Sequence, residues 1–135
     1  MEKIKIEYTK NLQTKLTHVR SGSSIYTEAP LDNEGTGESF SPTDLAAASL
    51  GACIMTIIGI AAKKHHFNID GAGVEIVKIM GDNPRRISEI IMDFDFSELN
   101  LGEKEKKIID YAIHNCPVEK SLHPDIIRTI KQIKY

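Results

Sequence analysis

One stretch of the sequence, from Leu45 to Ala62, contains no charged residue. Its length meets the threshold of roughly 18 residues for a membrane-spanning helix. It is also rich in Ala and Gly, includes Ser49 and Thr56, and has no flanking aromatic belt. We therefore interpret it as a buried helix of a soluble domain and expect no membrane contact. Because this helix is apolar on nearly all sides, it needs cover that a short chain finds most easily in a second copy, which predicts a homodimer.

The composition is that of one soluble domain. The chain has 135 residues, of which 41% are hydrophobic and 27% charged, so we predict a single domain over residues 1–135 with a core that needs no structural disulfide. A net charge of -2 without a Lys/Arg tract argues against nucleic-acid binding. The first ten residues, MEKIKIEYTK, lack the apolar stretch of a signal peptide, which predicts a cytoplasmic protein.

The first third of the chain has the period-two pattern of antiparallel strands. Ile4, Ile6 and Tyr8 alternate with charged residues, and the same style continues around the turn signal Ser21-Gly22-Ser23. We predict strands over residues 3–9, 13–19 and 23–29. The Gly- and Ser-rich segment that follows is a loop long enough to suspect a role.

The charge-free helix has a clear beginning. Ser41 is suited to cap it, Pro42 to occupy its first position, and Asp44 to complete a capping box with Ser41. We expect the helix to run to about His65. Its first half consists mainly of small residues, so we also expect another part of the backbone to approach it closely there.

The second half of the chain predicts an α+β fold. Ile90, Met92, Phe94 and Phe96 recur at every second position, as on the inner face of a strand. In chain order we predict two strands, an amphipathic helix, a short helix that starts at Pro117, and a final strand over residues 72–80, 86–96, 102–115, 117–122 and 125–135.

The two cysteines occupy different kinds of site. Cys116 precedes Pro117 and is predicted to be the N-cap of the short helix, where free N–H groups can lower the pKa of a thiol. Cys53 lies in the middle of the apolar helix, which disfavours a thiolate. From composition alone, each could simply pack as a small hydrophobe. A zinc site built on His114, Cys116 and His123 does not match a common ligand spacing, so we expect no metal.

Two sequence runs together resemble the OsmC/Ohr family, the osmotically inducible protein C and organic hydroperoxide resistance proteins. They are FSPTDLAAASLGACIMTIIGIAAKK and CPVEKSL, and the order of predicted elements is similar over the whole chain. The resemblance implies an OsmC-like α+β fold in an intertwined homodimer around a long central helix. It implies that Cys53 attacks organic or hydrogen peroxide, that Cys116 resolves the sulfenic acid to a disulfide, and that an external dithiol reduces it. It implies no metal and no organic cofactor.

The chain departs from the peroxidatic pattern at two positions. Thr43 stands where such relatives have a Glu, and the expected Arg position falls near Leu12 or Gln13. Arg20, the nearest arginine, becomes the candidate thiolate partner, and Lys10 and Lys15 are the other cations in this region. We therefore expect a slow hydroperoxide reductase with Cys53, Cys116 and Arg20 as its site. The alternatives are a dimer that binds a small ligand without turnover, and a redox sensor that uses the disulfide as a switch.

Overall fold

The structure, a computed structural model, describes residues 1–135. The chain forms two compact units, which we call the N-terminal unit (Met1–Ala46) and the C-terminal unit (Ala47–Tyr135). Each unit contains one three-stranded sheet.

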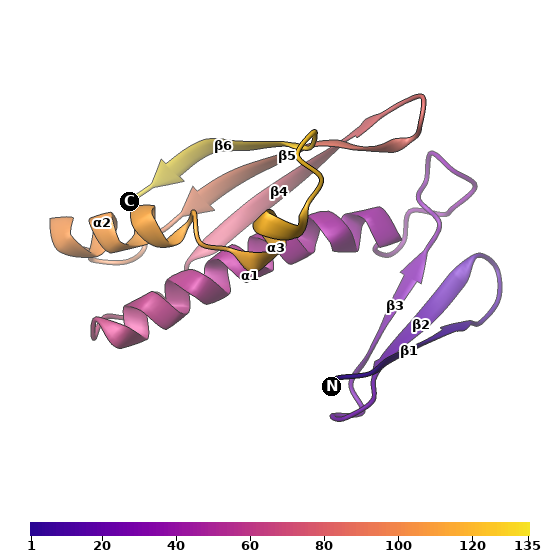
Figure 1. Ribbon diagram of the computed structural model, residues 1–135, viewed down its shortest axis with the longest axis horizontal. Coiled ribbons are helices and arrows are strands. Elements are labelled where there is room, and N and C mark those ends of the chain that lie inside the picture. Colours follow the sequence, from indigo (N-terminus) through magenta and orange to yellow (C-terminus); the bar gives the residue numbers. More distant parts are fainter. The chain divides into compact units, whose positions relative to one another are not determined.

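The N-terminal unit is an antiparallel sheet followed by a loop. Its strands pair in the order β1-β2-β3 (Figure 1). In this register Leu16 lies opposite both Ile6 and Ile25. The three strands lie within the ranges expected from the sequence, at β1 (Ile4–Tyr8), β2 (Gln13–His18) and β3 (Ser24–Glu28).

The alternation in β1 marks an apolar face, but this face is not buried. Ile4, Ile6 and Tyr8 are 65%, 67% and 64% exposed. The buried residues of the N-terminal unit are Thr27, Glu28 and, at its end, Ser41, all of them polar. Hydrophobic burial within one chain therefore does not explain how this unit is held together.

Hydrogen bonds to one buried carboxylate organise the loop after β3. Glu28 accepts hydrogen bonds from the Thr36 hydroxyl at 2.9 Å, from Ser39 N–H at 2.8 Å and from Glu38 N–H. Burial by itself raises the pKa of Glu28, but the hydrogen bonds from Thr36, Ser39 and Glu38 outweigh it and hold the pKa below its ordinary value of 4.5. The charged form of Glu28 thus ties the two sides of the loop together.

The same loop requires a glycine at one position. A Cβ atom on Gly35 would lie 1.5 Å from the carbonyl oxygen of Ala29, which no side chain tolerates. Gly35 N–H also donates to the Pro30 carbonyl at 2.9 Å, which closes a tight turn at this point. The conformation of this loop therefore requires glycine at position 35.

The central helix α1 (Pro42–Lys64) begins at the predicted capping box. Asp44 N–H donates to Ser41 Oγ at 3.1 Å, and Ser41 N–H donates to the Asp44 carboxylate at 2.9 Å. The helix ends one residue before the expected His65. By length and composition α1 could cross a membrane, but the core helix of a soluble protein passes the same test.

The C-terminal unit has a mixed sheet in the order β4-β5-β6 (Figure 1). β4 and β5 are antiparallel neighbours, whereas β6 pairs parallel with β5. Two helices connect β5 to β6, as a parallel crossover requires. The expected order of elements is confirmed, as β4 (Gly73–Gly81), β5 (Arg86–Asp95), α2 (Glu103–Ala112), α3 (Pro117–Ser121) and β6 (Ile127–Lys134).

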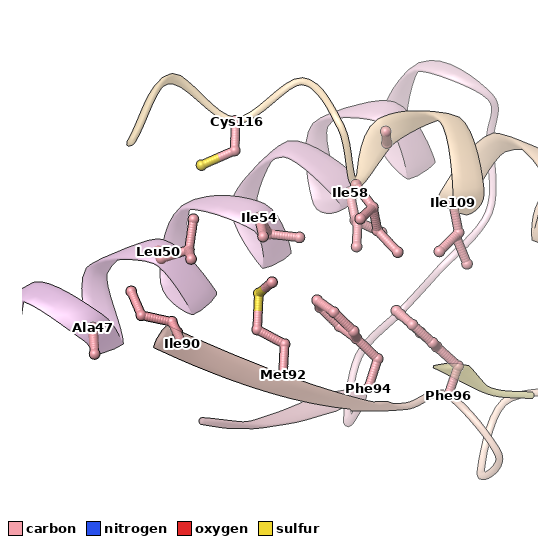
Figure 2. Close-up of a cluster of buried hydrophobic side chains, with 12 residues drawn as sticks. Ala47, Leu50, Ile54, Ile58, Ile90, Met92, Phe94, Phe96, Ile109 and Cys116 are labelled. Carbon is pink, nitrogen blue, oxygen red and sulfur yellow. The ribbon is translucent and has the colours of Figure 1, made fainter. Parts of the chain in front are cut away.

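The core of the C-terminal unit lies between α1 and β5. Figure 2 shows a row of β5 side chains facing a row from α1. The face predicted from the sequence is confirmed, since Ile90, Met92, Phe94 and Phe96 are at most 3% exposed. Opposite them, α1 contributes Ala47, Leu50, Ile54 and Ile58.

A glycine allows α1 to approach β4 closely. A Cβ atom on Gly51 would lie 2.8 Å from Cδ1 and 3.0 Å from Cγ1 of Ile76. The expected close approach at the small-residue half of the helix is therefore present. It brings the part of α1 that carries Cys53 firmly against the sheet.

Candidate functional site

Cys116 caps the short helix α3, as predicted. It has an extended backbone (φ -82°, ψ 123°), Pro117 follows it in the helix, and its Sγ accepts a hydrogen bond from Glu119 N–H at 3.4 Å. The side chain is completely buried and belongs to the same core cluster as Leu50 and Ile54 of α1 (Figure 2). The thiol is therefore held in a fixed position at the N-terminus of a helix.

The structure corrects the expectation that this position lowers the pKa of Cys116. Burial raises the pKa above its ordinary value of 9.0, and a hydrogen bond with Cys53 raises it further. The N–H groups of Glu119 and Val118 act in the opposite direction but do not compensate. Cys116 therefore keeps its proton at neutral pH, because burial outweighs the helix N-terminus.

Cys53 lies on α1, half-buried, and its side chain meets that of Cys116. Both cysteines are free thiols, and they lie close enough for Cys53 to raise the pKa of Cys116. Two residues far apart in the sequence thus share one polar contact within an apolar core.

Arg20 lies in the turn between β2 and β3, in the N-terminal unit. Its guanidinium contacts the Glu2 carboxylate at 2.9 Å, and its side chain is 80% exposed. The groups that act on the Cys116 thiol are Cys53 and two backbone N–H groups, with no cation among them. A role of Arg20 at the thiols stays a prediction.

An ion pair beside Cys116 was not found by sequence reasoning. Glu119, whose N–H bonds the Cys116 sulfur, lies 3.8 Å from Nε of Arg128, and both side chains are largely buried. Arg128 also donates to the carbonyl of Ile126 at 2.9 Å. The pair links α3 to the start of β6. No local sequence pattern predicts this ion pair, because Glu119 and Arg128 come together only when the connection between β5 and β6 has folded.

The comparisons with known proteins show the family of the chain. The family model described as OsmC-like protein matches residues 35–131, which include both cysteines. The chain belongs to the OsmC-like protein family. The predicted resemblance and the OsmC-like α+β fold are thereby confirmed. None of the curated proteins matches the chain.

Solved structures of this family share the fold over nearly the whole chain. A proposed osmotic stress induced and detoxification response protein from Psychrobacter arcticus is 42% identical, with a TM-score of 0.87 over 100% of this chain and 96% of that one. An organic hydroperoxide resistance protein, OsmC, from Legionella pneumophila is 15% identical, with a TM-score of 0.69 over 100% and 97%. The organic hydroperoxide resistance protein OhrB of Bacillus subtilis is 18% identical, with a TM-score of 0.58 over 96% of each chain. The last two identities are low, so these two similarities show the fold alone.

Proposed function

We propose that this OsmC-like protein is a slow, thiol-dependent hydroperoxide reductase with Cys53 as nucleophile and Cys116 as resolving thiol. The observation that carries the proposal is that the two free thiols lie together in one core cluster and interact with each other. Two free thiols in contact inside a core are poised for disulfide chemistry, because resolution needs a second thiol within reach of the first. The hydroperoxide resistance proteins of the same fold support the choice of oxidant.

The reaction begins on Cys53. The Cys53 thiol loses its proton to water and its thiolate attacks the outer peroxide oxygen. The O–O bond breaks, Cys53 becomes a sulfenic acid, and the departing alkoxide takes a proton from water and leaves as the alcohol. The Cys116 sulfur then attacks the Cys53 sulfur, its proton goes to the departing hydroxyl, and water and a disulfide form. An external dithiol finally reduces the disulfide by thiol–disulfide exchange.

The electrostatics of the pair explain why we expect a low rate. Cys116 keeps its proton and lies beside Cys53, so its S–H group is available to support the negative charge that the reaction requires on Cys53. No cation contributes at Cys116, and a missing hydrogen bond to a charged group is worth on the order of 1.5–3 kcal/mol. That difference corresponds to roughly ten- to hundredfold in rate if the contact exists in the transition state.

A peroxide-consumption assay tests the proposal. Cumene hydroperoxide and hydrogen peroxide are supplied with dithiothreitol or with a dihydrolipoyl dithiol. We expect Cys53→Ser to abolish turnover, Cys116→Ser to allow one turnover at most before over-oxidation of Cys53, and the control Thr56→Ser on the same helix to behave as wild type. Turnover that survives Cys53→Ser would refute the assignment of the nucleophile.

Arg20 is proposed as the cation that supports the Cys53 thiolate during the reaction. If so, Arg20→Ala slows peroxide consumption. The matched variant Glu2→Gln frees the guanidinium from its present partner and should accelerate the reaction or leave it unchanged. Equal rates in wild type and Arg20→Ala would remove Arg20 from the site.

We also propose that the protein is a homodimer. The exposed apolar face of β1 supports this, in addition to the apolar surface of α1. Apolar faces that are exposed to solvent in this way are unusual on a stable monomer. Sedimentation velocity at micromolar concentration should give about twice the mass of the chain, and a monomer under these conditions would contradict the proposal.

A further inference from the structure

The short helix α3 carries the proposed resolving thiol, but its own structure does not determine its orientation. Its five residues are far fewer than the roughly 12–15 at which an isolated helix becomes marginally stable. None of them is buried, and only Val118 packs against the hydrophobic core. Burial keeps the side chain of Cys116 inside the core, but apolar burial has no preferred direction. Directional contacts from outside the helix must therefore aim the sulfur.

Glu119 makes two contacts that connect this thiol to the rest of the C-terminal unit. Its backbone N–H donates to Sγ of Cys116 at 3.4 Å. Its carboxylate lies 3.8 Å from Nε of Arg128, and the two side chains are only 24% and 27% exposed. Solvent screens such a sheltered ion pair much less than a pair on the surface. One residue thus bonds the sulfur with its backbone and an arginine with its side chain.

Arg128 is fixed to the best-packed part of the unit. It lies in β6 opposite Ile90 of β5, whose side chain is 0% exposed. Its Nη1 donates to the carbonyl of Ile126 at 2.9 Å and to that of His123 at 3.4 Å, which holds the loop between α3 and β6. A planar guanidinium holds several acceptors in one arrangement. A continuous set of contacts therefore joins the core to the helix that carries the thiol.

We propose that Arg128 is a positioning residue for the resolving thiol. Through its ion pair with Glu119, it keeps α3 in the orientation in which Cys116 faces Cys53. This inference rests on the roles that the proposed function gives to the two cysteines. Resolution needs the attacking sulfur in line with the S–O bond that breaks, so a loss of orientation slows it. Arg128 is not among the groups that act on the Cys116 thiol directly, so its effect is on geometry.

A redox equilibrium without peroxide measures this orientation. In buffers of reduced and oxidised glutathione, Cys53 and Cys116 give two electrons and two protons to oxidised glutathione. The protein disulfide forms, and oxidised glutathione becomes two molecules of glutathione. The buffer ratio at half oxidation gives the effective concentration of one thiol at the other. A freely moving α3 would lose more freedom when the disulfide forms, so its effective concentration would be lower.

Removal of either partner of the ion pair should lower the effective concentration. We expect Arg128→Met and Glu119→Gln each to lower it about three- to tenfold, where tenfold is about 30 mV in reduction potential. The double variant should be no lower than Arg128→Met alone, because both substitutions remove the same interaction. Arg128→Lys keeps the charge and should recover part of the loss. The matched control Lys131→Met removes another cation of β6, which pairs with Asp93, and should behave as wild type.

A peroxide assay adds a readout that a general loss of stability would not change. Circular dichroism first establishes that each variant is folded at the temperature used, and Glu119→Gln carries the test if Arg128→Met is unfolded. With cumene hydroperoxide, Arg128→Met should oxidise Cys53 as fast as wild type. It should then yield more sulfinic acid and less disulfide, because resolution competes with over-oxidation. Mass spectrometry of the alkylated protein measures both products.

The results separate this inference from the proposed function. Equal effective concentrations in wild type, Arg128→Met and Glu119→Gln would overturn the positioning role, whether or not the protein reduces peroxide. A loss in Lys131→Met as large as that in Arg128→Met would also overturn it. Impaired disulfide formation in Arg128→Met and Glu119→Gln, in a protein that consumes no peroxide, would support the positioning role and refute the hydroperoxide reductase. A wild type that forms no disulfide in any buffer would overturn both.

Discussion

The two units of this OsmC-like protein are stabilised in different ways. The C-terminal unit has a core of buried side chains from α1, α2 and β5, and Phe94 and Phe96 stack within it. The N-terminal unit has no buried hydrophobic residue, and its most organised feature is the hydrogen-bonded carboxylate of Glu28. Apolar burial is the main source of stability in the C-terminal unit, whereas polar contacts and backbone pairing stabilise the N-terminal unit.

This difference has a consequence for how each unit responds to change. Hydrophobic burial stabilises a fold broadly, because each side chain contacts several others. Hydrogen bonds to one carboxylate stabilise a particular conformation of a particular loop. Substitutions in the C-terminal unit should therefore lower the stability of the whole unit, and substitutions in the N-terminal unit should act locally or depend on a partner.

The largest effect is expected in the core of the C-terminal unit. Phe94→Ala removes a ring that is 0% exposed, so it should lower the free energy of unfolding by about 3–5 kcal/mol. Urea denaturation followed by circular dichroism measures this. A loss below about 1 kcal/mol would show that the core tolerates a cavity and that hydrophobic burial is not the main source of stability in the C-terminal unit.

A smaller loss is expected from the loop of the N-terminal unit. Gly35→Ala forces a Cβ atom onto the Ala29 carbonyl, so the loop must rearrange, at a cost on the order of 2 kcal/mol. Gly73→Ala is the matched control, because a Cβ atom there meets nothing within 4 Å. Limited proteolysis should cut between residues 29 and 40 faster in Gly35→Ala than in the control. Equal cutting rates in the two variants would contradict the prediction.

A third variant tests whether a second copy covers the apolar face of the N-terminal unit. Ile6→Ala should cost less than about 1 kcal/mol in a monomer, because the side chain is 67% exposed. If the protein is a dimer that buries this face, the cost should rise with protein concentration, since association and folding are then linked. Thermal unfolding at several concentrations distinguishes the two. A cost independent of concentration would exclude Ile6 from an interface.

The smallest effect concerns the charge of Glu28. Its pKa in the folded state is lowered, so its contribution to the loop is present at neutral pH and is lost as the pH falls below 4.5 through the lowered pKa. The amide resonances of Glu38 and Ser39 should follow this titration in NMR spectra. In Glu28→Gln these changes should disappear. A midpoint above 4.5 would mean that burial outweighs the hydrogen bonds.

Local patterns predicted much of this fold. The face of β5 with Ile90 and Phe94 was visible because a strand buried on one side alternates strictly. The start of α1 was visible because Ser41 and Asp44, three residues apart, each bond the other's backbone N–H. Strand pairing was harder to predict from the sequence. Nothing in the residues of β6 indicates that it lies parallel to β5, because the pairing depends on the path of the whole chain.

The sequence predicted where Cys116 lies, but not the electrostatics around it. The N-cap role of Cys116 followed from the Pro117 that comes after it, which is a local signal. The pKa of Cys116 was expected in the wrong direction, because burial is a property of the folded core and is not visible in neighbouring residues. The ion pair of Glu119 and Arg128 was missed for a similar reason, since its partners belong to different elements.

The parallel pairing of β5 and β6 determines when the two thiols can meet during synthesis. Cys116 lies on the crossover between these strands, and the crossover is anchored at both ends only after β6 has left the ribosome. Cys53 and the whole of α1 emerge much earlier. A nascent chain therefore carries Cys53 before Cys116 is in place, and we expect the two thiols to come together as one of the final steps of folding.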